Sequence, residues 1–346
     1  MNYTRVRLAS FGYELPPNVV SSEDLERRLA PMYAALKIQN GQLEAITGIR
    51  ERRYWDPGFQ LSRGAAQAGR KAIDASAVSP DRIGMLIYGA VCRENLEPAS
   101  ACAVADALAL PRNCLIYDVS NACLGMLNGM INVANAIELG QIQAGLVVAC
   151  ESAREIVDLT IERLNRETNM EVLRKTVATL TGGSGAVAVL LTDSDLTPSG
   201  HRLRGGAARS APEHHRLCVW GPDTGIPGGT RHMAETDSVQ VLHNGVALGI
   251  ETFHEFRRAL ALAESQPDKI ICHQVGATHQ RAILDAIGLP AERDFTTFRH
   301  LGNIGTVSLP ITAAIAEERG FLKTGDMVGF LGIGSGLNCL MLGIDW

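Results

Sequence analysis

The sequence lacks several features that would point to a membrane or a nucleic acid. None of its 346 residues lies in a run that approaches the roughly 20 consecutive apolar residues of a membrane-spanning helix. Residues 1–7 contain no apolar core of signal-peptide length. Basic residues are not clustered, and the net charge of −5 gives no indication of nucleic-acid binding. We therefore expect a cytoplasmic protein with no membrane span and no nucleic-acid partner.

Patterns typical of metal sites and disulfide scaffolds are also missing. The eight cysteines contain no Cys-x-x-Cys pair, which argues against both zinc and a disulfide framework. The histidines form no His-x-x-x-His cluster. We predict no metal and no cofactor, and we expect most of the cysteines to be ordinary core residues.

One cysteine, Cys123, occupies a position suited to a nucleophile. It lies where a predicted strand at residues 114–117 turns directly into a predicted helix at residues 124–139. Unpaired N–H groups and the helix dipole favour a thiolate at such a position, which predicts a thiol pKa below its usual value of about 8.5. The alternative is a small buried cysteine that packs at the start of a helix.

The chain contains an internal repeat. Residues 70–83 align without a gap with residues 257–270, and both stretches predict a helix, a turn and a buried strand. Glycines follow Cys123 by 17 and 22 residues, and glycines follow Asn303 at the same spacing. Two matches of this kind indicate that the chain consists of two duplicated α/β halves.

The duplication predicts where the halves divide. Turn-forming residues at 192–200 place the boundary near residues 195–210, so the halves are residues 1–200 and 201–346. The first half also contains a helical insertion at about residues 151–180, with apolar residues spaced among many charges. We expect the insertion to form surface helices or a lid; a plain amphipathic cover over the core is the alternative.

The same duplication brings three candidate site residues together. Equivalent loops of two halves related by a pseudo-twofold axis meet, and here these loops are the turns at Cys123 and Asn303. His273 ends the strand that corresponds to residues 86–88, so we expect it to face the same cleft. A cysteine thiolate forms a thioester, while His273 and Asn303 donate hydrogen bonds to an enolate or carbonyl oxygen in a second step. The pattern suits acyl transfer with carbon–carbon bond formation, although a core histidine and a turn asparagine are the ordinary alternatives.

A glycine near the C-terminus completes the candidate site. Gly336, in the segment 334–338, permits a close approach of the backbone. Its N–H and that of Cys123 form the predicted oxyanion hole, and an ordinary turn glycine is the alternative interpretation.

Five motifs follow one another along the chain. They are Thr-Gly-Ile-Arg-Glu-Arg-Arg at 47–53, Ser-Asn-Ala-Cys at 120–123, Cys-His-Gln at 272–274, Gly-Asn-Ile-Gly-Thr-Val-Ser-Leu-Pro at 302–310 and Gly-Ile-Gly-Ser-Gly-Leu at 332–337. With them the chain resembles the ketosynthase III branch of the thiolase superfamily, which includes the initiating 3-oxoacyl-acyl-carrier-protein synthases. The resemblance implies a five-layer α-β-α-β-α thiolase-like fold, usually a homodimer, with Cys123, His273 and Asn303 as the catalytic triad. It also implies fatty acyl-CoA substrates, with acyl carrier protein as a further candidate partner.

Within this branch the chain most resembles the head-to-head condensing enzymes of olefin biosynthesis, on residues 93–98, 121–124 and 332–339. These enzymes join two fatty acyl-CoA molecules without decarboxylation, which requires a base for an α-proton. Glu97 matches the position of that base, which the partner subunit supplies. A solvated loop residue is the alternative for Glu97, and Glu94 is the second candidate.

The function implied is a Claisen condensation of two acyl-CoA molecules to a 2-alkyl-3-oxoacyl-CoA through an acyl-cysteine intermediate. One alternative is a 3-oxoacyl-acyl-carrier-protein synthase III, which generates its carbanion by losing CO₂ from malonyl-acyl-carrier protein. Residues 275–277 depart from that group, because they read Val-Gly-Ala where Ala-Asn is typical. A second alternative function is acyl transfer to the oxygen or nitrogen of a small acceptor. A third is a non-catalytic partner subunit. The sequence assigns neither the acyl chain length nor the residues that contact CoA.

Overall fold

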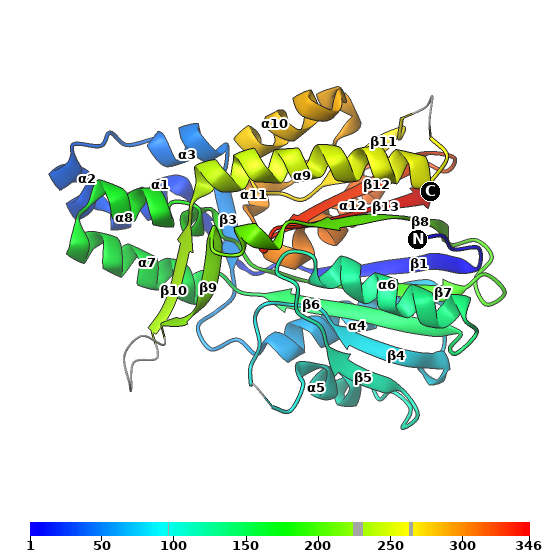
Figure 1. Cartoon of the computed structure of the whole chain (residues 1–346). Helices are drawn as coiled ribbons and strands as arrows, with labels where there is room; N and C mark the ends of the chain where they lie inside the picture. The colour runs from blue at the N-terminus through cyan, green and yellow to red at the C-terminus, as the bar shows by residue number, and fades with distance from the viewer. Residues whose placement is uncertain (96, 224–230, 263–265) are drawn as a thin grey trace.

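The computed structural model describes residues 1–95, 97–223, 231–262 and 266–346. Leu96, within the motif at 93–98, and residues 263–265, within the repeat, lie outside the described residues. Figure 1 shows a mixed α/β arrangement in which helices cover a long central sheet.

Among the described residues, nine strands form the central sheet. They are β1 (Val6–Glu14), β4 (Ile83–Tyr88), β5 (Leu115–Asp118), β6 (Ala144–Glu151), β7 (Gly185–Asp193), β8 (His201–Ser210), β11 (Lys269–Cys272), β12 (Met327–Gly334) and β13 (Asn338–Asp345). Two small antiparallel sheets consist of β2 (Asn18–Ser21) with β3 (Glu51–Tyr54), and of β9 (Cys218–Asp223) with β10 (Arg231–Thr236).

The helices lie between these strands along the chain, singly or in groups. They are α1 (Ser22–Arg28), α2 (Ala30–Leu36), α3 (Gln42–Thr47), α4 (Leu61–Ser76), α5 (Ser100–Ala107), α6 (Gly125–Glu138), α7 (Arg154–Glu167), α8 (Met170–Thr176), α9 (Ser238–Ala259), α10 (Ala277–Ile287), α11 (Phe298–Leu301) and α12 (Ser308–Glu318). Within the described ranges, no helix is long and apolar enough to cross a membrane.

The sheet repeats its own topology. Its order is β11-β12-β13-β8-β1-β7-β6-β4-β5, and its two parts meet where β8 pairs with β1 at Arg7–Arg202 and Leu8–His201. On one side of this junction, β1–β7 and β7–β6 are antiparallel and β6–β4 is parallel. On the other side, β8–β13 and β13–β12 are antiparallel and β12–β11 is parallel. The predicted duplication into two α/β halves is confirmed.

The helices follow the same symmetry and form layers. α4 packs on β1 and β7, and α9 packs on the corresponding strands β8 and β13. α12 lies between the two parts of the sheet, because it contacts β1 and β7 on one side and β11 on the other. α6 contacts β6 and β7, and its first turn also meets β12, since a Cβ atom at Gly332 would lie 2.6 Å from Leu127. The layers therefore run helix, sheet, helix, sheet, helix.

Continuous apolar runs explain the buried centre of this arrangement. Every residue of β6 and β7 is buried, and both strands have helices on their faces. Strands that are buried on both faces read as unbroken apolar runs rather than as alternating patterns. The first nine residues of α12 are also all buried.

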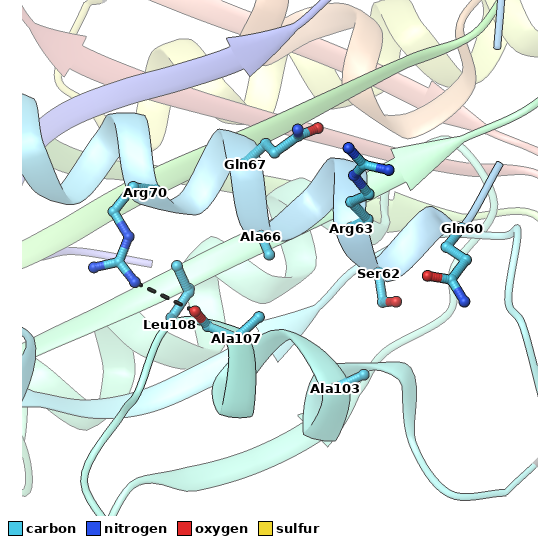
Figure 2. A pocket seen from close by; sticks show the side chains of 9 residues that line it. All are labelled: Gln60, Ser62, Arg63, Ala66, Gln67, Arg70, Ala103, Ala107 and Leu108. Carbon is cyan, nitrogen blue, oxygen red and sulfur yellow. Dashed lines mark hydrogen bonds between the residues drawn. The ribbon is translucent and has the colours of Figure 1, made fainter. Parts of the chain in front are cut away.

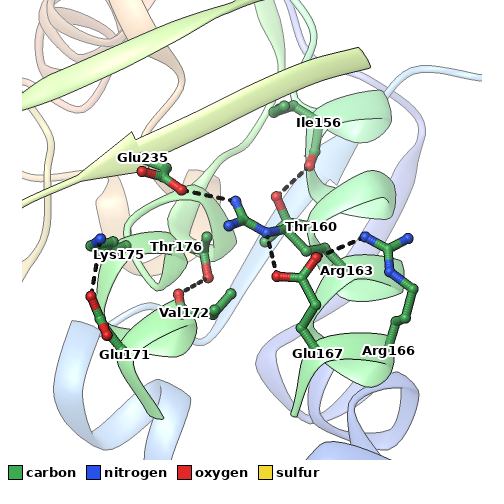
Figure 3. Close-up of polar contacts among 10 residues, drawn as sticks. All are labelled: Ile156, Thr160, Arg163, Arg166, Glu167, Glu171, Val172, Lys175, Thr176 and Glu235. Carbon is green, nitrogen blue, oxygen red and sulfur yellow. Dashed lines mark hydrogen bonds and ion pairs between the residues drawn. The ribbon is translucent and has the colours of Figure 1, made fainter. Parts of the chain in front are cut away.

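The segment in which helices are expected, residues 151–180, contains α7 and α8. Together with α1 and α2 they form an apolar cluster of their own, which includes Leu29, Val157 and Leu164. Arg163 on α7 binds Glu167 at 3.1 Å and Glu235 of β10 at 3.0 Å, as Figure 3 shows. These contacts connect the helices of the first half to the β9–β10 hairpin of the second.

Candidate functional site

Cys123 lies in the turn between β5 and α6, where the sequence places it. The preceding residue, Ala122, has a φ of 45°, in the left-handed region that non-glycine residues seldom adopt. Directly after the turn, α6 begins against the segment that follows β4. Gly125 makes this approach possible, because a Cβ atom there would lie 2.3 Å from the carbonyl oxygen of Gly89. The turn is therefore held tightly by backbone packing.

The protonation state of Cys123 differs from the prediction. The residue is of intermediate exposure, yet its thiol pKa is raised to about 12, mainly by loss of water around the sulfur and in smaller part by Cys218 and the Glu151 carboxylate. At the helix start, the Met126 N–H is already bound by Thr306 Oγ1 at 2.8 Å. The predicted lowering of the thiol pKa is wrong, because desolvation outweighs the helix N-terminus. Nucleophilic attack by this thiol therefore requires a base.

Asn303 lies in a loop that contacts the residues just after the 151–180 segment. Its N–H donates to Thr181 O at 2.9 Å, and its own carbonyl accepts from the Gly183 N–H at 2.9 Å. Its side-chain Oδ1 accepts from the Gly305 N–H at 3.1 Å. Because a backbone N–H can only donate, this contact identifies the oxygen of the amide and leaves Nδ2 as a donor for another group.

His273 follows β11 and is bound on two sides. Its backbone N–H donates to Leu331 O of β12 at 3.0 Å. Its Nδ1 lies 2.8 Å from Ser308 Oγ, at the first residue of α12. The imidazole pKa is lowered to about 4, mainly by burial and in smaller part by neighbouring His279. The imidazole is therefore uncharged at neutral pH.

A short chain of hydrogen bonds joins His273 to Asn303. Ser308 Oγ, which contacts the imidazole, donates to Gly305 O at 2.7 Å. The Gly305 N–H in turn donates to the side chain of Asn303. Thr306, in the same loop, binds the first turn of α6, two residues after the helix N-cap. This loop therefore contains Asn303, binds His273 and contacts the first turn of the helix that follows Cys123.

The segment that contains Gly336 also lies against the Cys123 turn. A Cβ atom at Gly334, the last residue of β12, would lie 3.4 Å from the backbone nitrogen of Cys123. The side-chain Nδ2 of Asn338 donates to Asn121 Oδ1 at 3.1 Å. Gly336 itself has a φ of 134°, which glycine tolerates and other residues rarely adopt. The two segments of the predicted oxyanion hole are thus neighbours.

A buried carboxylate that the sequence patterns do not indicate lies beside this site. Glu151, at the end of β6, is 4% exposed and accepts from the Val91 and Cys92 N–H groups at 3.0 and 3.1 Å. A Cβ atom at Gly305 would lie 3.3 Å from its side chain, and burial raises its pKa. An acidic residue after an apolar strand reads as the start of the 151–180 insertion, so the sequence carried no signal of its burial.

Glu97 is not part of the loop that binds His273 and contains Asn303. It is exposed, in the loop between β4 and α5. Before it, Glu94 accepts from the N–H and hydroxyl of Ser62 at 2.9 and 3.0 Å. After it, the Asp118 carboxylate accepts from the first N–H groups of α5, at 2.9 Å from Ser100. The loop is therefore attached at both ends, with Glu94 bound to its own chain and Glu97 exposed between the attachments.

A groove of about 420 Å³ lies between α4 and α5, and Figure 2 shows its lining. Arg70 donates to Ala107 O across it at 3.3 Å, and Ser62 at one end is the residue that binds Glu94. No member of the predicted triad lines this groove. Among the described residues, no group of three His, Cys, Asp or Glu side chains is arranged to hold a metal ion.

Two family models match the chain. One describes 3-oxoacyl-[acyl-carrier-protein (ACP)] synthase III and covers residues 117–205, and the other describes the C-terminal part of that protein and covers residues 258–346. Cys123 lies in the first region, and His273 and Asn303 lie in the second.

Curated relatives extend over the whole chain. The chain is 51% identical over 349 residues to the acyl-CoA:acyl-CoA alkyltransferase of Shewanella oneidensis, with 100% of both proteins covered. It is 36% identical over 347 residues to the protein of the same name from Xanthomonas campestris, again with 100% of both covered. A crystal structure of Xanthomonas campestris OleA with bound lauric acid and lauroyl-CoA matches with a TM-score of 0.93 and 35% identity, covering 99% of this chain and 100% of that one. The predicted thiolase-like fold is confirmed.

Proposed function

The chain belongs to the acyl-CoA:acyl-CoA alkyltransferase family, within the 3-oxoacyl-acyl-carrier-protein synthase III group, and we propose that it condenses two fatty acyl-CoA molecules to a 2-alkyl-3-oxoacyl-CoA. The observation that carries the proposal is the single loop, residues 303–308, that connects the Cys123 helix, His273 and Asn303. A nucleophile and hydrogen-bond donors at one place are the groups that acyl transfer requires.

In the first half-reaction, Cys123 Sγ attacks the carbonyl carbon of one acyl-CoA. The N–H groups of Cys123 and Gly336 stabilise the oxyanion that develops, and CoA leaves as the thiol. The close packing of Gly334 on the Cys123 nitrogen supports this assignment, because it brings the two segments together. The product is an acyl-cysteine thioester.

In the second half-reaction, a carboxylate removes an α-proton from another acyl-CoA. We assign this role to Glu97 of a second copy of the chain, because Glu97 is exposed on a loop attached at both ends. The Nδ2 of Asn303 is available to hold the enolate oxygen, with His273 beside it. The enolate attacks the thioester, and Cys123 leaves as a thiolate that takes up a proton. This assignment makes the active protein a homodimer, and we place it in the cytoplasm.

The decarboxylative synthase III is the second candidate, because the matching family models carry that description. It would use malonyl-acyl-carrier protein and would need no carboxylate base. The 51% identity to an acyl-CoA:acyl-CoA alkyltransferase over the full chain favours the head-to-head condensation instead.

The test supplies lauroyl-CoA alone, without any malonyl donor. We expect a branched 3-oxoacyl-CoA product, detected by mass spectrometry, and release of free CoA. Turnover that appears only after malonyl-acyl-carrier protein is added would overturn the proposal in favour of the synthase. Acylation of a small alcohol or amine, with no carbon–carbon bond in the product, would also contradict it.

A further inference from the structure

The contacts of Ser308 determine which nitrogen of His273 carries a proton. Ser308 Oγ lies 2.7 Å from Gly305 O and 2.8 Å from His273 Nδ1. A carbonyl oxygen cannot donate, so two oxygens at 2.7 Å require the hydroxyl proton between them. A serine hydroxyl has a single proton, which is therefore not available to His273. The proton of the second hydrogen bond must come from Nδ1.

The other imidazole nitrogen then carries a lone pair. Burial keeps His273 uncharged at neutral pH, and a neutral imidazole has only one N–H. Since that N–H is at Nδ1, Nε2 is a hydrogen-bond acceptor in the resting protein. Ser308 is 0% exposed, so its hydroxyl is shielded from bulk solvent.

The resting state of Cys123 is complementary to that of His273. Its thiol keeps the proton, because burial raises the thiol pKa to about 12. The site therefore holds an uncharged thiol and an uncharged imidazole rather than an ion pair. Attack on a thioester needs an acceptor for the thiol proton, and Nε2 is an uncharged acceptor on a residue connected to the same loop.

We propose that Ser308 is a positioning residue, which holds His273 as the Nδ1–H tautomer so that Nε2 accepts the Cys123 thiol proton during acylation. This role rests on the proposed function, because it describes the first half-reaction. The role of His273 in this proposal differs from the one expected from the sequence. There, His273 donates a hydrogen bond in the second half-reaction.

During acylation the thiol proton of Cys123 passes to His273 and then to the departing CoA. The S–H bond of Cys123 breaks, an N–H bond forms at Nε2, and the sulfur electron pair forms the new thioester bond. The bond between the acyl carbon and the CoA sulfur breaks, and that sulfur takes the proton from Nε2. CoA leaves as a thiol, and His273 returns to its resting tautomer. Asn303 Nδ2 is then the side-chain donor for the enolate oxygen, because Nε2 carries no proton.

The tautomer can be measured without any substrate. Protein labelled with ¹⁵N in histidine gives distinct nitrogen shifts for protonated and unprotonated ring nitrogens, and the His273→Asn variant identifies the signals of His273. We expect Nδ1 to be protonated and Nε2 unprotonated at neutral pH. The reverse assignment in the wild-type protein would overturn the proposal, whatever the protein does with acyl-CoA.

Two variants of Ser308 test the chemical consequence. Ser308→Ala removes the acceptor for Nδ1, so we expect mixed tautomers and a fall of about 10- to 100-fold in the rate of Cys123 acylation by lauroyl-CoA, with little change in KM. Ser308→Thr keeps the hydroxyl and should restore both the tautomer and most of the rate. Unchanged acylation in Ser308→Ala would contradict the proposal, and so would equal losses in both variants with the wild-type tautomer retained.

A probe that needs no acyl-CoA separates this inference from the proposed function. Alkylation of Cys123 by iodoacetamide also releases the thiol proton, so Ser308→Ala should slow it and Ser308→Thr should not. If the wild-type protein failed to condense acyl-CoA, the proposed function would fail, while slower alkylation and altered tautomers in Ser308→Ala would still support the role of Ser308.

Discussion

The side chains of Asn338 and Asn121 form a hydrogen bond of 3.1 Å between two segments 217 residues apart in the chain. Asn121 continues this contact by donating to Asn128 Oδ1 on α6 at 2.8 Å. One segment contains Cys123 and the other contains Gly336. The backbone N–H groups of these two residues form the proposed oxyanion hole. The asparagine pair therefore joins the segment of Cys123 to the segment of Gly336.

Asn338→Ala should weaken transition-state stabilisation more than substrate binding. Loss of the contact with Asn121 allows the two backbone segments to move apart, so we expect kcat to fall about tenfold, with little change in KM. The matched control is Asn128→Ala, which removes the other partner of Asn121 and leaves the link to the Gly336 segment intact. Steady-state kinetics with lauroyl-CoA check this; equal losses of kcat in both variants would contradict it.

Cys123→Ala should abolish formation of the acyl-enzyme. The wild-type protein is expected to gain one lauroyl group on incubation with lauroyl-CoA, seen as an increase in intact mass. Cys102→Ala is the control, because Cys102 is exposed and plays no part in the site. Acylation that persists in Cys123→Ala would show that another residue is the nucleophile.

Glu97→Gln should separate the two half-reactions. We expect Cys123 acylation to remain and condensation to fall at least about 100-fold, because the amide cannot remove an α-proton. Glu94→Gln is the matched control, since that side chain binds Ser62 and is not needed as a base. Comparison of acyl-enzyme mass with product yield distinguishes the variants. Normal condensation by Glu97→Gln would remove Glu97 from the mechanism.

Mixed subunits test whether Glu97 acts on the partner. A heterodimer of Cys123→Ala and Glu97→Gln chains contains one site with an intact Cys123 and an intact Glu97 only if the base crosses the interface. After random exchange of subunits, we expect recovery of about one quarter of the wild-type activity. No recovery, with heterodimers verified by mass, would place both residues in the site of one chain.

Asp294 should make the stability of the fold depend on pH. It accepts from the Cys272 N–H at 3.1 Å and from Gln280 Nε2 at 2.8 Å, and burial raises its pKa from 3.8 to about 6. A pKa that is higher in the folded state means that folding favours the protonated form. This contribution is complete below pH 3.8 and is lost as the pH rises through about 6; it amounts to about 3 kcal/mol.

Urea denaturation of the wild-type protein and Asp294→Asn checks the sign. The free energy of unfolding of the wild-type protein should fall relative to that of the variant between about pH 4 and about pH 7. The variant is the reference for the wild-type protein, because its amide does not titrate. A difference that stays constant over this range would mean that Asp294 is ionised at a normal pKa.

Local and periodic features were determined by the sequence alone. The strand, turn and helix around Cys123 come from residues within 30 positions, and β5 and α6 begin and end within one residue of their predicted bounds. The repeat can be recognised in the sequence because glycines follow Cys123 and Asn303 at equal spacings. The matching sheet topology of the two halves confirms it. Residue type and spacing suffice for such inferences because they depend on neighbours along the chain.

Only the tertiary structure decided the protonation states and the long-range contacts. The pKa of Cys123 depends on how much water packing removes, and chain order does not reveal it. The contact of Ser308 with His273 spans 35 residues, and Glu151 is buried among groups from the segment after β4 and from the Asn303 loop. A pKa or a tautomer is determined by the groups within hydrogen-bond distance, and in this site those groups come from distant segments.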